Sequence, residues 1–107
     1  RLFAGDSGVC REAEADAREH PTQDLDQLSI GFYECLAMAG DLAGADEART
    51  ALPADPTLNP VALWAHGALL LDAGRGPEAL PLLAEACPQL EDVQRYTCET
   101  ALAALQP

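Results

Sequence analysis

Two similar stretches of the sequence, 34 residues apart, constrain the fold more than any other feature. The stretch GDLAGADEARTAL begins at Gly40 and GRGPEALPLLAEA begins at Gly74, and each follows an apolar segment of similar length. A period of this size is typical of chains built from a repeated pair of short helices. We therefore expect repeated helical units.

The composition also favours helices. Apolar residues make up 49% of the chain and are mostly Ala and Leu, whereas aromatic residues make up only 5%. Ala and Leu are strong helix formers, while strands are enriched in β-branched and aromatic residues. Because 107 residues suit one hydrophobic core, the sequence predicts a single all-α domain.

Local signals divide the chain into six short helices. Asn59 followed by Pro60 favours a helix start, and Gly40 and Gly74 favour helix ends. Pro81 removes a backbone donor early in the fifth helix, so it predicts a kink or a later start there. The expected helices span about residues 8–19, 25–39, 43–52, 60–72, 76–87 and 90–105.

Several of these helices carry an apolar face. Ser7 and Asp24 are the expected N-caps of the first two helices, and Pro21 ends the first. Apolar residues recur at helical spacing on the first, second and last helices. These residues are Val9, Cys10, Ala13 and Ala17; Leu25, Leu28, Phe32, Leu36 and Ala39; and Val93, Tyr96, Ala101 and Leu105.

The repeat resembles the tetratricopeptide repeat, a 34-residue helix–turn–helix unit. In the better copy, about residues 60–93, Gly67 matches the small residue at which the two helices of a unit cross. The copy at about 26–59 is poorer, because Tyr33 and Arg49 replace the small crossing residue and a large apolar residue. Other matching positions in the better copy are Leu70, Gly74, Ala79, Leu83 and Ala86.

The resemblance implies a short α-solenoid of about six antiparallel helices. Its parts would be an orphan helix that lacks the first half of its repeat, two repeats, and a helix that caps the stack. Within a single domain of residues 1–107, these parts span about residues 8–19, 24–55, 60–88 and 90–105, in that order.

Four cysteines lack the CxxC spacing of a zinc or redox site. They form disulfides or, alternatively, remain as buried free thiols. In an antiparallel helix pair, residues equally distant from the turn are neighbours, which predicts the bridges Cys10–Cys35 and Cys87–Cys98. Disulfides indicate an extracytoplasmic location: the periplasm, the cell surface or the secreted fraction.

The charge balance excludes some partners. Six Arg, no Lys and 18 acidic residues give a formal net charge of −12, which repels nucleic acid and anionic membrane surfaces. Salt adaptation or codon bias would also explain this balance. The apolar runs are too short to span a membrane. Met38 is the only methionine and the chain begins at Arg1, as expected of a processed secreted protein or of a fragment.

Two motifs that suggest an enzyme have a simpler explanation. GDSG at residues 5–8 resembles the nucleophile segment of trypsin-like serine proteases, but only four residues precede it, so helix capping by Ser7 accounts for it. GRGPEA at residues 74–79 mimics a dinucleotide-binding loop, yet it follows a helix and no βαβ unit surrounds it. We therefore expect no catalytic residues and no cofactor.

Neither histidine has a partner at metal-binding spacing. His20 is expected at a helix C-terminus, where the helix dipole favours it, and His66 shares a face with Leu63 and Leu70 as a semi-buried residue. The acidic series EAEADARE in the first helix lacks the residue order of a calcium loop and is expected to be a solvated face. No metal site is predicted.

In tetratricopeptide proteins, the first helix of each pair lines a concave groove that binds partners. Chaperone-binding members hold a peptide carboxylate with Lys and Asn, which are absent from the corresponding face here. A one-residue change of register would instead turn Trp64 into the core. The resemblance implies a groove lined by Ile30, Glu34, Ala37, Met38, Val61, Trp64, Ala68, Leu71, Leu102 and Leu105.

Two functions follow from these observations. The first is a non-enzymatic, extracytoplasmic protein-binding module, in which the groove buries an apolar segment of another protein and acidic residues at its edge set specificity. The alternative is a structural subunit that assembles with copies of itself into an oligomer or fibre, because the ends of solenoids expose apolar faces unless polar caps cover them.

Overall fold

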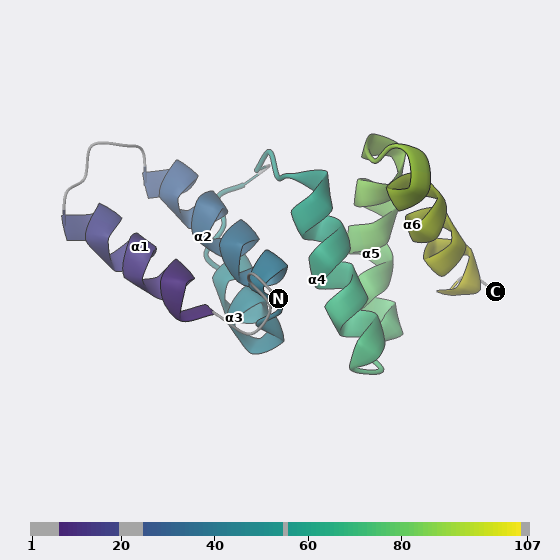
Figure 1. Cartoon of the computed structure of the whole chain (residues 1–107), viewed down its shortest axis with the longest axis horizontal. Coiled ribbons are helices and arrows are strands. Elements are labelled where there is room, and N and C mark those ends of the chain that lie inside the picture. The colour runs from purple at the N-terminus through teal and green to yellow at the C-terminus, as the bar shows by residue number, and fades with distance from the viewer. Residues whose placement is uncertain (1–6, 20–24, 55, 106–107) are drawn as a thin grey trace. The chain divides into compact units, whose positions relative to one another are not determined.

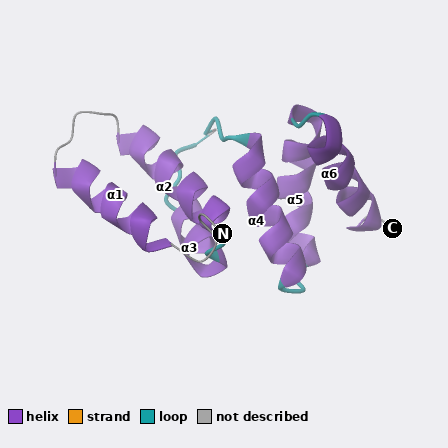
Figure 2. Ribbon diagram, in the orientation of Figure 1, coloured by secondary structure: helices purple, strands orange, loops and turns teal. Residues whose placement is uncertain are grey.

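The described residues of the chain are helical. The computed structural model describes residues 7–19, 25–54 and 56–105, which contain six α-helices, one short 3-10 helix and no strand (Figures 1 and 2). The prediction of an all-α fold is confirmed. The elements are α1 (Ser7–Glu19), α2 (Leu25–Ala39), α3 (Leu42–Arg49), α4 (Pro60–Asp72), α5 (Gly76–Ala86), η1 (Cys87–Gln89) and α6 (Asp92–Leu105).

The chain divides into two compact units, Arg1–Leu58 and Asn59–Pro107, and we describe each by itself. In unit 1, α2 packs against α1 and α3. In unit 2, α5 packs against α4, α6 and η1. The expected N-cap Asp24, together with His20 and Pro21, lies outside the described residues.

The two glycines of the 34-residue period end their helices in the same way. Gly40 and Gly74 have positive φ angles of 86° and 76°, which cost glycine little because it has no Cβ. After α2, the Asp41 amide donates to the Leu36 carbonyl; after α4, the Arg75 amide donates to the Leu70 carbonyl. Both ends are Schellman motifs, and each is followed within two residues by the next helix. The period is therefore a repeat of local structure.

The fourth helix begins where the sequence predicts. The Asn59 side-chain oxygen accepts a hydrogen bond of 2.9 Å from the Val61 amide, and Pro60 occupies the first helical turn. Asn at this position satisfies a donor that lacks a partner within the helix, while Pro has no donor to satisfy. This pair of residues sets the first residue of α4.

The third helix starts one residue before the expected Ala43 and ends at Arg49 rather than at Leu52. Asp41 caps its start, because the carboxylate accepts a 2.9 Å hydrogen bond from the Gly44 amide. After Arg49, the amides of Ala51 and Leu52 bond to carbonyls three residues back, and no further α-helical turn forms. A proline follows Leu52 and disfavours the helical conformation there.

The last two helices also depart from expectation. α5 begins at Gly76, so the later start predicted from Pro81 is wrong; this proline is exposed within the helix. α6 begins at Asp92 rather than at Leu90, because residues 87–89 form a 3-10 turn and Leu90 is extended. Asp92 itself has a positive φ of 54°, which Asp tolerates better than most residues.

Each unit has its own core. In unit 1 the core centres on α2, where Tyr33 and Leu36 are fully buried and Ala45 joins them from α3. Tyr33 is thus a core residue of unit 1. In unit 2, fully buried residues of α4 and α5 form the core: Leu63, His66, Leu82 and Leu83.

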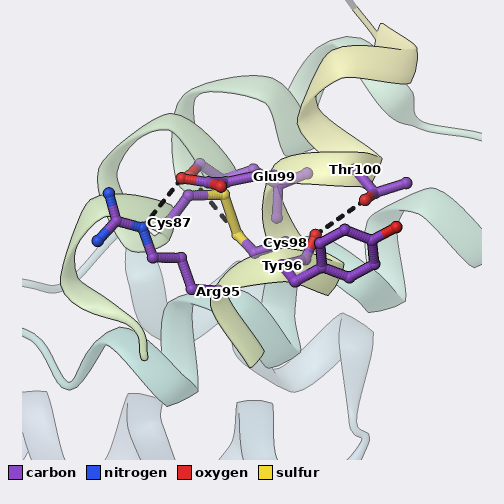
Figure 3. Close-up of polar contacts among 7 residues, drawn as sticks. Cys87, Arg95, Tyr96, Cys98, Glu99 and Thr100 are labelled. Atoms are coloured by element: carbon purple, nitrogen blue, oxygen red, sulfur yellow. Dashed lines mark hydrogen bonds and ion pairs between the residues drawn. A yellow bond between two sulfur atoms is a disulfide. The ribbon is translucent and has the colours of Figure 1, made fainter. Parts of the chain in front are cut away.

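Both predicted disulfides are present. Cys10 and Cys35 join α1 to α2 with a Cα–Cα distance of 5.8 Å, and Cys87 and Cys98 join η1 to α6 with a Cα–Cα distance of 5.5 Å (Figure 3). The alternative of four free thiols is wrong. Each disulfide closes within a single unit.

The helices α1 and α6 each bury only a cysteine among their described residues. Cys10 is the only described residue of α1 that is buried, and Cys98 is the only buried residue of α6 in the structure. The expected apolar faces of these helices are therefore wrong in part, because Val9, Val93 and Tyr96 are exposed. An apolar stripe is buried only as far as a neighbouring element covers it.

Candidate functional site

The main apolar surface among the predicted groove residues lies on α4. Val61, Trp64, Ala68 and Leu71 are half-buried, and their spacing of three and four residues places them on one face of the helix, which we call the α4 stripe. No Asp, Glu, Lys or Arg occurs in α4 before Asp72, its last residue. The stripe can therefore make apolar contacts and few ionic ones.

A different face of α4 packs within unit 2. Gly67 lies against α5, since a Cβ placed on it would be 2.7 Å from Leu83 Cδ2 and 3.8 Å from Leu82 Cβ. Leu63 and Leu70, which share this side of the helix, are buried as well. The close approach at Gly67 holds α4 against α5 and so fixes the orientation of the stripe within the unit.

His66 belongs to the core, as the sequence predicts, although it is buried rather than semi-buried. Its side chain is 1% exposed, and the described residues contain no buried side-chain nitrogen or oxygen without a hydrogen-bond partner. A buried imidazole with its polar atoms satisfied supports packing rather than ligand binding.

The other predicted groove residues have different surroundings. On α2, Ile30 and Ala37 are buried, Glu34 is half-buried, and Met38 is 49% exposed. Leu102 and Leu105 of α6 are half-buried. Of the predicted set, the α4 stripe is the group whose four members are all apolar and all half-buried.

Sequence reasoning missed a shallow hollow between α1 and α2. Ala17, Leu28 and Phe32 give it apolar walls, and Glu14 and Gln27 lie at its polar edge. The Arg11 guanidinium carbon lies 6.0 Å from the centre of the Phe32 ring. The same Arg11 pairs with Asp41 at 3.2 Å, so that an ion pair joins α1 to the capped start of α3.

Gly31 of α2 also borders this hollow, and we expect Gly31→Ala to raise the free energy of unfolding by about 0.5–1 kcal/mol. Glycine weakens a helix interior, and a Cβ at this position would meet no described atom within 4 Å. Urea unfolding followed by circular dichroism checks this. Unchanged or lower stability would mean that the hollow has no room for a methyl group.

Two searches of the described residues concern metal ligands and membrane spans. Residues 7–19, 25–54 and 56–105 contain no group of three or more His, Cys, Asp or Glu that could hold a metal ion. Of the GDSG motif, Gly5 and Asp6 lie outside the described residues. No helix in the described part of the chain is long and apolar enough to cross a membrane.

We compared the chain with protein-family models, curated proteins and solved structures, and none of them matches it.

Proposed function

We propose that this chain is a non-enzymatic protein-binding module of the tetratricopeptide type and that the α4 stripe is the centre of its contact surface. One observation carries the proposal: α4 is apolar on two faces, while Gly67, Leu63 and Leu70 occupy only one of them. A helix that is apolar on all sides needs cover on all sides. A partner that covers the stripe would bury Trp64, a residue type enriched among energetic hot spots.

The repeat of local structure supports the family assignment. The Schellman motifs at Gly40 and Gly74 lie 34 residues apart, and a helix pair surrounds each. This arrangement has the period of the tetratricopeptide unit. Members of that family bind partners through the first helix of a pair, which is the position of α4.

The disulfides and the charge support the location and the kind of partner. Two disulfides are compatible with the periplasm, the cell surface or the secreted fraction. With a net charge of −12, the chain favours a partner that carries basic residues beside its apolar segment. We therefore propose an extracytoplasmic module that binds an apolar segment with basic flanks.

A peptide selection tests this proposal. Peptides of about 15 residues, displayed on phage and selected on the wild-type protein, should be rich in apolar and basic residues, and Trp64→Ala should weaken their binding about tenfold or more. Trp64 is the only tryptophan, so its fluorescence should also change when a peptide binds. Leu25→Ala, at an exposed apolar residue of unit 1, is the matched control and should bind normally.

The competing role of Trp64 as a core residue gives a different result. If the residue only packs inward, Trp64→Ala should lower the free energy of unfolding by about 3 kcal/mol or more. Peptides that bind equally well to the folded Trp64→Ala and wild-type proteins, or no enrichment at all, would refute the proposed function.

A further inference from the structure

The Cys10–Cys35 disulfide lies beside the hollow between α1 and α2. Both cysteines border this hollow, which has a volume of about 200 Å³. A cavity of about 150 Å³ already holds a molecule of the size of benzene. The space beside Gly31 is open, because a Cβ at this position would meet no described atom within 4 Å. A small molecule that enters the hollow can therefore reach the residues of the disulfide.

The two disulfides of the chain differ in exposure. Cys35 is half-buried, and its partner Cys10 is 3% exposed. In the other bridge, Cys87 is 2% exposed and Cys98 is fully buried, with its Sγ 3.8 Å from the carbonyl oxygen of Leu83 in the core of unit 2 (Figure 3). Exposed disulfides are the ones that thiols reduce most readily. Exposure therefore favours reaction at the Cys10–Cys35 bridge.

The helix ends also distinguish the two bridges. In thiol–disulfide exchange, a thiolate attacks one sulfur and the other sulfur leaves as a thiolate. Cys10 is the fourth residue of α1, at the end of its first turn, where the positive end of the helix dipole favours a negative charge. Cys87 is the C-cap of α5, where the dipole has the opposite sign. Cys10 is therefore the better leaving group.

We propose that Cys35 is a site of thiol–disulfide exchange with low-molecular-weight thiols that enter the hollow. The thiolate of a first thiol bonds to Cys35 Sγ, the Cys10–Cys35 bond breaks, and Cys10 leaves as a thiolate that takes a proton from water. A second thiol attacks the small-molecule sulfur of this mixed disulfide and releases Cys35. Two electrons thereby pass to the protein, and two small thiols become one disulfide. This inference is separate from the proposed function, which concerns the α4 stripe.

Exchange at this bridge changes the surface of unit 1. Leu28 and Phe32 of α2 border the hollow, and α1 forms its opposite side. Cys10 is the only described residue of α1 that is buried. Once its bond to Cys35 is broken, α1 should detach and expose Leu28 and Phe32. The reduced protein should therefore present an apolar surface that the oxidised protein covers.

Mild reduction of the native protein tests the proposal. The protein is treated with β-mercaptoethanol, free thiols are trapped with iodoacetamide, and the modified cysteines are identified by peptide mass spectrometry. A mixed disulfide on Cys35 and an alkylated Cys10 should appear at least about tenfold faster than any change at Cys87 or Cys98. In guanidinium-denatured protein, the two bridges should react at similar rates, because the fold then shields neither of them.

Two variants at Gly31 test whether the thiol enters through the hollow. Gly31→Leu fills the hollow and should slow exchange at Cys35 several-fold relative to Gly31→Ala. Leu and Ala have similar helix propensities, so the comparison removes the effect of a stronger α2. Neither variant should change the reactivity of Cys87 and Cys98. Circular dichroism establishes that both variants fold.

Three results would overturn the proposal. They are faster or equal modification of Cys87 and Cys98 in the native protein, a first mixed disulfide on Cys10 rather than on Cys35, and equal exchange rates for the two Gly31 variants. The first two are measured on the wild-type protein and do not depend on whether the variants fold. Trp64→Ala should undergo the same exchange, so that the result is independent of the peptide selection.

Discussion

Removal of the Cys10–Cys35 disulfide should unfold α1 while α2 stays helical. Cys10 is the only described residue of α1 that is buried. The noncovalent contacts of α1 with the rest of unit 1 include the Arg11–Asp41 ion pair, in which the Arg11 side chain is 53% exposed, and the approach of Arg11 to the Phe32 ring. Exposed ion pairs contribute about 0–1 kcal/mol, whereas a disulfide with this separation of 25 residues contributes roughly 3 kcal/mol. A free helix of 13 residues is marginal in water.

The experiment replaces both cysteines by alanine, a strong helix former, so that any loss of helix comes from lost attachment. Amides of α1 should lose their protection from hydrogen exchange, and the circular dichroism at 222 nm should weaken in proportion to 13 residues. Cys87→Ala with Cys98→Ala is the matched control, because it should release α6 and leave α1 protected. Full protection of α1 without its disulfide would show that noncovalent contacts suffice.

Features that depend on local chemistry could be predicted from the sequence. At the start of α4, the Asn59 side chain accepts a hydrogen bond from a backbone amide, and Pro60 has no backbone donor that would need a partner. Gly40 and Gly74 adopt the positive φ that a Schellman motif requires. The disulfide pairing also followed from the sequence, because residues equally far from a turn lie close together in a pair of helices. These features need no knowledge of distant packing.

The depth of burial could not be predicted in the same way. The apolar spacing of Val9, Val93 and Tyr96 predicts a buried face, but α1 and α6 are outer helices whose one described buried residue is a cysteine. The hollow beside Gly31 gives no periodic signal, since a single glycine in a helix is compatible with close packing or with open space. Only the neighbouring elements decide between these outcomes.

In the candidate site too, the sequence predicts which residues share a helix face but not how deeply they are buried. The spacing of Val61, Trp64, Ala68 and Leu71 places them on one face of α4 from the sequence alone, and their half-buried state agrees with that placement. Ile30, in contrast, was expected to line the groove and is 7% exposed. A helical period identifies which residues share a face but not what covers that face.

Substitution of Gly67 should destabilise unit 2 through overpacking. A Cβ at this position would lie 2.7 Å from Leu83 Cδ2 and 3.2 Å from Leu83 Cγ, and Leu83 is fully buried, so a movement of its side chain must be accommodated by neighbouring core residues. Replacing glycine by alanine within a helix stabilises the folded state by up to about 1 kcal/mol through helix propensity, whereas overpacking destabilises it by about 1–3 kcal/mol. We therefore expect Gly67→Ala to lower the free energy of unfolding slightly and Gly67→Val to lower it by about 3 kcal/mol.

Gly31 provides the matched control, because it also lies within a helix but has open space where a Cβ would be. The same change to alanine should stabilise the protein at residue 31 and destabilise it at residue 67, so the difference between the two variants measures the packing of α4 against α5 without the contribution of helix propensity. Urea unfolding of both variants gives this difference. If Gly67→Ala stabilised the protein as much as Gly31→Ala, Leu83 would be able to turn away at no cost, and the close approach of the two helices would not depend on glycine.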